Sequence, residues 1–175
     1  AIMAGGSGTR FWPLSTSSRP KQFLNFFGSK SLFSETVDRV LDLVPNENVA
    51  AMTLPVYEDH ISSQVSWFKE ENFLYEPSLR NTAPAIAAAC FRIFRKNPDA
   101  VIAFLPSDHF VTPIESFKKD LGLAFQKAKE GGIATIGIEP SFPSTDYGYI
   151  ECDRTRKDEN GFVQVVSFHE KPPLD

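Results

Sequence analysis

A glycine-rich turn placed directly behind a short apolar run constrains the fold of this chain more than any other feature. The apolar residues Ala1, Ile2 and Met3 indicate the end of a β-strand, and the sequence continues as Ala4-Gly5-Gly6-Ser7-Gly8-Thr9-Arg10. Because glycine has no Cβ atom, such a turn can bring backbone N–H groups together around an anion. A strand that ends in this way predicts an α/β fold with an anion site at the edge of its sheet.

Two basic side chains near the turn make phosphate the expected anion. Arg10 presents a planar fork of donors that matches phosphate oxygens, and Lys21 adds a mobile point charge. Pro13 and Pro20 fix the backbone of the loop between these cations. The glycines do not match the G-x-G-x-x-G of dinucleotide-binding folds, and no Lys-Ser or Lys-Thr follows Gly8 as a Walker loop requires. We therefore predict that this segment cradles the triphosphate of a nucleotide.

The composition limits what else the protein can bind. The 175 residues, 42% of them apolar, suffice for one domain with a hydrophobic core. A net charge of −4 argues against a nucleic-acid surface, so phosphate binding must be local. The two cysteines are too few for a disulfide framework, and no apolar run is long enough to span a membrane, so we expect a cytoplasmic protein. The chain opens in mid-strand without an initiator methionine, and we expect it to be a portion of a longer protein.

Apolar runs and amphipathic segments alternate along the chain as far as residue 138. The apolar runs predict strands at 48–53, 73–75, 100–105 and 133–138, and helical periodicity predicts helices over 32–44, 57–69, 82–96 and 112–130. Ser31 is suited to cap the first of these helices, and Asn81 or Thr82 the third. The alternation predicts right-handed βαβ units around a mostly parallel central sheet flanked by helices, an α/β fold of Rossmann-like type. Beyond residue 138 we predict two consecutive strands, 147–152 and 162–169, joined by a charged loop.

Five sequence motifs resemble those of one enzyme family. The glycine turn and the R-P-K-Q-F at residues 19–23 resemble the nucleotide-binding signature of sugar-1-phosphate nucleotidyltransferases, especially the mannose-1-phosphate guanylyltransferase branch. Further resemblances are the E-P-S-L-R-N-T-A-P-A from residue 76, the L-P-S-D-H from residue 105, the T-D-Y-G-Y-I-E from residue 145 and the F-H-E-K-P from residue 168. The resemblance implies the Rossmann-like nucleotidyltransferase fold, of which residues 1–175 are the N-terminal portion of the catalytic domain.

The resemblance also implies a role for particular residues. The expected catalytic residues are Arg10, Lys21 and Asp108. The expected nucleotide-binding residues are Ala4, Gly5, Gly6, Gly8, Thr9, Arg10, Asn81, Thr82 and Pro84. The expected sugar-phosphate-binding residues are Gly148, Glu170 and Lys171.

Asp108 is also the expected ligand of the cofactor, Mg²⁺ or another divalent cation. From the residues alone, an aspartate behind a buried strand is equally a loop residue or a ligand for a hard cation, and the resemblance favours the ligand. The family has a second metal-binding aspartate that would fall beyond residue 175. Asp146 stands where the family commonly has a glycine, and Thr16 stands where many members have a basic residue.

The implied reaction is the transfer of GMP from GTP to mannose 1-phosphate by in-line attack on the α-phosphate, giving GDP-mannose and pyrophosphate. The two substrates are the expected partners, with no nucleic acid and no membrane, and homo-oligomerisation is left open. A thymidylyltransferase acting on glucose 1-phosphate shares the glycine loop, but the R-N-T-A-P-A segment argues against it. A regulatory subunit without catalysis is disfavoured because Arg10, Lys21 and Asp108 are all present. An NAD-binding oxidoreductase lacks support in the glycine spacing.

Overall fold

The computed structural model describes residues 1–6, 8, 11–78 and 80–173. The chain forms two compact units, Ala1–Phe125 and Gln126–Asp175, and each is described by itself. The helix α4 (Ile114–Lys129) begins in the first unit and ends in the second.

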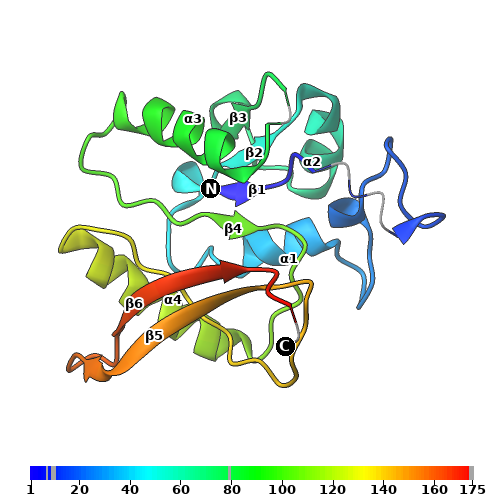
Figure 1. The fold of residues 1–175 in the computed structure, drawn as a ribbon. Helices are drawn as coiled ribbons and strands as arrows, with labels where there is room; N and C mark the ends of the chain where they lie inside the picture. Colours follow the sequence, from blue (N-terminus) through cyan, green and yellow to red (C-terminus); the bar gives the residue numbers. More distant parts are fainter. Residues whose placement is uncertain (7, 9–10, 79, 174–175) are drawn as a thin grey trace. The chain divides into compact units, whose positions relative to one another are not determined.

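A parallel sheet forms the centre of the first unit. Its strands are β1 (Ile2–Met3), β2 (Ala51–Thr53), β3 (Phe73–Tyr75) and β4 (Leu105–Pro106), in the spatial order β3-β2-β1-β4 (Figure 1). Ile2 pairs with Ala51 on one side and with Leu105 on the other, and every pairing is parallel. The predicted α/β fold with a mostly parallel sheet is therefore confirmed.

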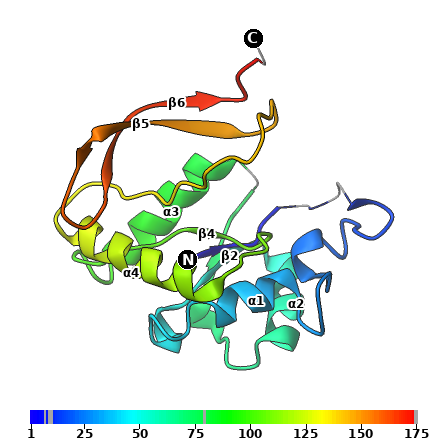
Figure 2. The same cartoon turned by 90° about the horizontal axis from the view of Figure 1, so that it is seen from below.

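Helices cover both faces of this sheet. The helix α3 (Thr82–Phe94) lies on one side, and α1 (Leu32–Asp38) and α2 (Glu58–Gln64) lie on the other (Figure 2). Successive residues of β3 serve the two layers because strand side chains alternate. Leu74 is buried in a cluster with Met52 and Ala89 of α3. Phe73 contacts the ring of Phe68, which in turn meets Phe33 of α1 edge-on; the ring centroids are 5.6 and 6.0 Å apart.

The first two helices are shorter than their periodicity predicts. Ser31 caps α1 as expected, because its Oγ accepts a hydrogen bond from the backbone N–H of Ser34 at 3.1 Å. The regular helix ends at Asp38, and the chain continues in a series of turns. One of these turns is closed by a hydrogen bond from the Val44 N–H to the Val40 carbonyl at 3.1 Å. The second helix ends at Gln64, yet the predicted apolar side of that segment is buried, with Ile61 fully inaccessible. Single 3₁₀ turns η2 (Lys21–Phe23), η3 (Asn46–Asn48), η4 (Pro55–Tyr57) and η5 (Glu70–Asn72) occur in the connections.

An antiparallel hairpin forms the second unit. Its strands are β5 (Gly148–Lys157) and β6 (Val163–Glu170), which confirms the two consecutive strands predicted for this part of the chain. The turn at its tip is closed by Asp158, whose carboxylate accepts hydrogen bonds from the backbone N–H groups of Asn160 and Phe162 at 3.0 and 2.9 Å. Helix α4 ends before Gly131 and Gly132, both at φ +99°, where the sequence predicts its end.

Two strand predictions need correction. The sequence predicts a fully buried central strand at 100–105, but only Leu105–Pro106 pairs, and residues 101–104 are half-buried. The run 133–138, also predicted as a strand, is not one in the structure, where Ile133 is 100% and Ile138 86% exposed. An apolar run becomes a strand only when a neighbour supplies ladder hydrogen bonds, and within the second unit β5 and β6 pair with one another.

Across the described part of the chain, no helix combines the length and the apolar character that crossing a lipid bilayer requires.

Candidate functional site

A cavity of about 590 Å³ lies where the parallel strands of the first unit end. The glycine turn follows β1, Glu76 follows β3, and Asp108 comes shortly after β4. Ligands of open α/β sheets bind at this edge, outside the carboxyl ends of the strands. The sequence-predicted residues that line the cavity are Gly5, Gly6, Gly8, Lys21, Asn81, Thr82 and Asp108.

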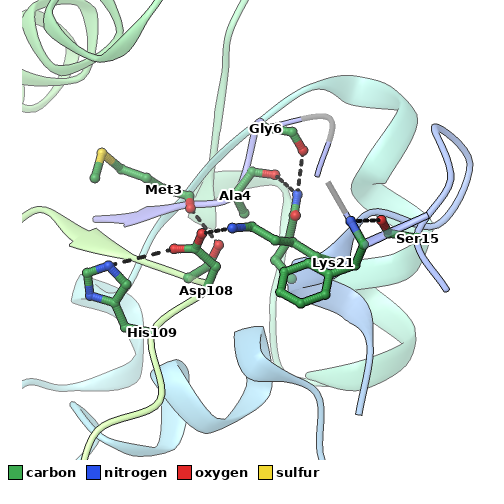
Figure 3. A network of polar contacts seen from close by, with 10 residues as sticks. Met3, Ala4, Gly6, Ser15, Lys21, Asp108 and His109 are labelled. Carbon is green, nitrogen blue, oxygen red and sulfur yellow. Dashed lines mark hydrogen bonds and ion pairs between the residues drawn. The ribbon is translucent and has the colours of Figure 1, made fainter. Parts of the chain in front are cut away.

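Lys21 and Asp108, two of the predicted catalytic residues, form an ion pair in this cavity. Lys21 opens the turn η2, and its ammonium points toward the carboxylate that follows β4 (Figure 3). Their side chains are 22% and 29% exposed, so both groups are within reach of a ligand in the cavity. His109 lies at the margin, with Nε2 4.0 Å from Asp108 Oδ1.

The loop that carries Asp108 is fixed on both sides of it. Ser107 is buried, and its backbone N–H and its hydroxyl both donate to the carbonyl of Met3, at 3.2 and 2.6 Å (Figure 3). On the other side, Arg39 Nη2 donates to the carbonyl of His109 at 3.0 Å. Arg39 is 5% exposed, and burial lowers the pKa of its guanidinium from a very high ordinary value. Asp108 is thus held between β1 and the end of α1.

Gln22 fixes the backbone of the glycine turn by hydrogen bonds. Its amide nitrogen donates to the carbonyls of Ala4 and Gly6, at 2.9 and 2.8 Å, and the residue is 3% exposed (Figure 3). Gly8 has φ +58°, and a Cβ atom there would lie 2.6 Å from the backbone nitrogen of Lys21. Only glycine fits that position. The turn and the segment that bears Lys21 are therefore packed directly against one another.

The remaining nucleotide-binding predictions have different outcomes. Asn81 and Thr82 line the cavity, and Asn81, one of the two residues expected to cap α3, occupies its N-cap position but makes no side-chain capping hydrogen bond. Asn81 adopts φ 66°, and this positive φ turns the chain into the helix. Pro84 lies in the first turn of α3, as expected, and is not among the described residues that line the cavity. Thr9 and Arg10 lie outside the described residues.

The three predicted sugar-phosphate residues gather at one end of the hairpin in the second unit. Gly148 pairs directly with Glu170, and a Cβ atom on Gly148 would lie 2.8 Å from Glu170 Oε2. Lys171 Nζ is 3.0 Å from Glu170 Oε1, and the Lys171 backbone N–H donates to the carbonyl of Tyr147 at 3.1 Å. Glycine at 148 therefore leaves room for the glutamate carboxylate.

The donor set at Asp108 fits a divalent cation that takes most of its ligands from elsewhere. Mg²⁺ is usually bound by one or two carboxylates together with water and substrate phosphate oxygens. The described residues contain no group of three or more His, Cys, Asp or Glu that would enclose a metal by itself. In the structure a cation, the Lys21 ammonium, already lies against this carboxylate.

Sequence reasoning missed four residues that shape the site: Gln22, Arg39, Glu76 and Ser107. Three of them, Gln22, Glu76 and Ser107, lie inside motifs recognised in the sequence. The motifs place these residues near the site but do not predict which groups they contact. Arg39 lies in a region predicted only as a helix, and nothing in its local pattern indicates a contact with the loop after β4.

A glycine turn behind the first strand, together with a cation and a carboxylate paired at the strand ends, gives this α/β domain a candidate phosphate site. The family model described as nucleotidyl transferase matches residues 1–175, and the chain belongs to that family.

Similar proteins are named for sugar-nucleotide chemistry. The chain is 38% identical over 178 residues to the mannose-1-phosphate guanylyltransferase of Sinorhizobium fredii, covering 100% of this chain and 34% of that protein. It is 37% identical over 177 residues to a mannose-1-phosphate guanylyltransferase of Escherichia coli, covering 98% and 37%. A crystal structure of mannose-1-phosphate geranyltransferase from Thermus thermophilus matches with a TM-score of 0.84 and 32% identity, over 98% of this chain and 49% of that one. The chain thus spans little more than a third of the length of these curated relatives.

Proposed function

We propose that the full protein transfers GMP from GTP to mannose 1-phosphate, releasing pyrophosphate and forming GDP-mannose. The observation that supports this most is the meeting of Lys21 and Asp108 beside the glycine turn, in one cavity at the carboxyl edge of the sheet. The similarity to proteins named mannose-1-phosphate guanylyltransferase supports the choice of substrates.

Positioning and charge compensation account for most of the chemistry in this proposal. In phosphoryl transfer without a covalent intermediate, an enzyme mainly aligns the nucleophile and stabilises the charge of the phosphates. The amides of the glycine turn, Arg10 and Lys21 hold the triphosphate so that its α-phosphorus faces the incoming sugar phosphate. A phosphate oxygen of mannose 1-phosphate attacks that phosphorus, and pyrophosphate leaves on the opposite side. Lys21 offsets the negative charge that builds up on the oxygens of the α-phosphate during the transfer.

Asp108 has the second role in the proposal, as a ligand of Mg²⁺ or another divalent cation. That cation, when bound, supplies positive charge to the reacting phosphates. The hydrogen bonds of Ser107 and Arg39 fix the backbone on both sides of Asp108, independently of the Lys21 ion pair.

Residues of the second unit receive the sugar phosphate. Glu170 is a hydrogen-bond acceptor for sugar hydroxyls, and Lys171 is a counter-charge for the phosphate group. Both side chains are largely exposed, at 75% and 60%, so both have free capacity for a ligand.

The proposal is tested by measuring pyrophosphate release from the full-length protein with Mg²⁺, crossing four nucleoside triphosphates with mannose, glucose and N-acetylglucosamine 1-phosphates. Turnover confined to GTP with mannose 1-phosphate is the expected result. Turnover with another pair would support the same class of reaction but contradict the proposed substrates, GTP and mannose 1-phosphate. No turnover with any pair, while GTP still binds, would instead identify a regulatory subunit.

A further inference from the structure

A second cavity of about 600 Å³ lies in the first unit and has no role in the proposed reaction. Residues at the start of α1 and along α2 line it, the two helices that share one face of the sheet (Figure 2). Among the described residues, none lines both this cavity and the cavity of the glycine turn. Cavities of this size commonly hold small organic ligands. The second cavity is therefore large enough for a ligand of its own.

The charges in this lining favour an anion. Arg19 and Lys30 are its permanently charged cations, and Asp38 is the one carboxylate among the described lining residues. Asp38 forms an ion pair with Lys30, so that lining leaves the guanidinium of Arg19 without a carboxylate partner. A guanidinium presents parallel N–H donors that match the oxygens of a phosphate group. Arg19 is exposed, so these donors are open to a ligand.

The backbone around Arg19 directs this residue into a different cavity from that of Lys21. Arg19 and Thr16 exchange two backbone hydrogen bonds of 3.1 Å each, and the Arg19 N–H also contacts Thr16 Oγ1 at 3.1 Å. Pro20 follows, fully buried, with φ −62°. The next two residues, Lys21 and Gln22, line the cavity of the glycine turn. The motif that supplies Lys21 to the proposed phosphate site thus supplies Arg19 to the second cavity.

Hydrogen bonds among α1, α2 and the segment of Arg19 fix the walls of the second cavity. The Ser31 hydroxyl donates to Gln64 Oε1 at 2.5 Å, and Gln64 Nε2 donates to the carbonyl of Phe23 at 3.4 Å. His60 stacks on the ring of Phe23, with centroids 5.2 Å apart. The Nε2 of His60 also donates to the carbonyl of Ser18 at 2.7 Å. The cavity is therefore formed by groups that already hold one another in place.

The remaining lining groups suit a ligand with several hydroxyl groups. Ser29, Ser63 and Ser66 are exposed residues of the lining, and each serine hydroxyl can donate and accept a hydrogen bond. Trp67 is half-buried, and its ring centroid lies 4.8 Å from that of Phe68, which supports the indole from one side. A sugar ring carries hydroxyl groups on its edge and C–H groups on its faces. Such a ring matches both the serines and the indole.

We propose that the second cavity is a binding site for a sugar phosphate. Arg19 pairs with the phosphate group, the serine hydroxyls bond the sugar hydroxyls, and Trp67 covers one face of the sugar ring. The site is distinct from the one proposed for the sugar-phosphate substrate, which uses Glu170 and Lys171 of the second unit.

Calorimetry on the unaltered full-length protein tests the class of ligand. The probes are glucose 6-phosphate and mannose 6-phosphate, with free glucose, free mannose and inorganic phosphate as comparisons. At least one hexose 6-phosphate is expected to bind about ten-fold or more tightly than inorganic phosphate and than its own free sugar. No binding of either hexose 6-phosphate would overturn the proposal. Equal affinity for inorganic phosphate would also overturn it, because the sugar would then contribute nothing.

The variant Arg19→Gln tests the residue that pairs with the phosphate. It should weaken hexose 6-phosphate binding about ten-fold or more and leave the unfolding midpoint nearly unchanged, since the hydrogen bonds of Arg19 to Thr16 come from its backbone. Arg95→Gln, which alters an exposed arginine in neither cavity, is the matched control and should bind as the unaltered protein does. Unchanged binding in Arg19→Gln would overturn the proposal.

Trp67→Leu tests the sugar end of the site independently of Arg19. This variant should bind hexose 6-phosphates several-fold more weakly and inorganic phosphate as the unaltered protein does. An equal loss of both ligands, or no loss of either, would contradict the contact between the indole and the sugar. The result decides the matter even where Arg19→Gln does not fold.

Lys171→Gln separates the second site from the proposed substrate site. Hexose 6-phosphate binding should persist in this variant, while the KM for mannose 1-phosphate should rise. Binding lost in Lys171→Gln and kept in Arg19→Gln would place the probes at the substrate site and overturn the proposal. The binding measurements do not depend on turnover. A protein that binds hexose 6-phosphates through Arg19 and shows no turnover would retain the second site and lose the proposed reaction.

Discussion

Lys21 and Asp108 form an ion pair that contributes little to stability. Both side chains are partly open to solvent, and a pair in that setting is worth about 0–1 kcal/mol. Its position is better explained by the roles that we propose for the two groups toward phosphate and a cation. Either side chain can therefore be removed without unfolding the protein, and activity becomes a direct readout.

We expect Lys21→Ala and Asp108→Asn to reduce kcat of the full-length protein about 10²–10³-fold, the usual effect of removing one preorganised charge-stabilising group. Circular dichroism and the unfolding midpoint should remain close to those of the unaltered protein. Lys30→Ala is the matched control, since Lys30 also forms an ion pair, with Asp38, but does not line the cavity of the glycine turn. Near-normal turnover of either site variant would remove that residue from the mechanism.

Gln22 makes a second prediction at the residue scale. Gln22→Met keeps the shape of the side chain but removes both hydrogen bonds to the glycine turn, leaving the carbonyls of Ala4 and Gly6 without this donor. A buried carbonyl that loses its donor costs about 1–3 kcal/mol, but Gly6 is exposed and the Ala4 carbonyl still accepts from the Thr53 hydroxyl at 3.5 Å, so urea unfolding should show a loss of about 1 kcal/mol. The KM for GTP should rise more than the KM for mannose 1-phosphate. Gln64→Met, which removes a polar side chain bonded to Ser31, should lower stability without that selectivity, and equal effects in both variants would refute the role of Gln22 in the turn.

At the scale of single elements, the hairpin of the second unit offers a test in which the fold is preserved. In Gly148→Ala the new methyl group would meet the end of the Glu170 side chain, which is flexible and exposed and can move aside. We expect an almost unchanged unfolding midpoint and a several-fold higher KM for mannose 1-phosphate, with KM for GTP unchanged. Glu170→Gln should show the same selectivity, and Gly137→Ala, where a Cβ atom meets nothing within 4 Å, should show no effect. A larger effect on GTP than on the sugar phosphate would contradict the assignment of Glu170.

How far the sequence predicts each element depends on whether the determining contacts are local. The strand at 73–75 is predicted with its observed bounds, and Ser31 is identified as a cap, because apolar runs and capping residues act locally. The helix over 32–44 is predicted too long because its end is decided by packing of the turns after Asp38. The run at 133–138 is predicted as a strand from composition alone, although strand formation depends on a distant partner. The roles of Gln22, Ser107 and Arg39 also depend on distant contacts. Each of them donates a hydrogen bond to a backbone carbonyl that is far away in the sequence, so no local pattern predicts it.

On the scale of the whole molecule, the proposed phosphate site belongs to a chain with a net charge of −4. The overall field therefore disfavours an anion, and affinity must come from groups held close to the phosphates. The groups that we propose for this in the first unit all line one cavity: the glycine turn and Lys21, drawn from the first 21 residues, for the phosphates, and Asp108 for the cation. Sequence motifs predict this set because each member lies within a short conspicuous segment, while the fold supplies the proximity.

Binding at this site should be visible in the unfolding of the full protein. A ligand that binds only the folded state stabilises it by about 2.7 kcal/mol at a hundred-fold excess over its Kd. We expect GTP with Mg²⁺ to raise the midpoint of thermal unfolding of the unaltered protein and of Lys30→Ala equally, because the Lys30–Asp38 pair does not line the nucleotide cavity. In Lys21→Ala the midpoint without nucleotide should be nearly unchanged, and the rise caused by GTP should largely disappear. A full GTP-dependent rise in Lys21→Ala would show that the triphosphate binds elsewhere, and the cavity at the ends of β1 and β4 would then lose its assignment as the phosphate site.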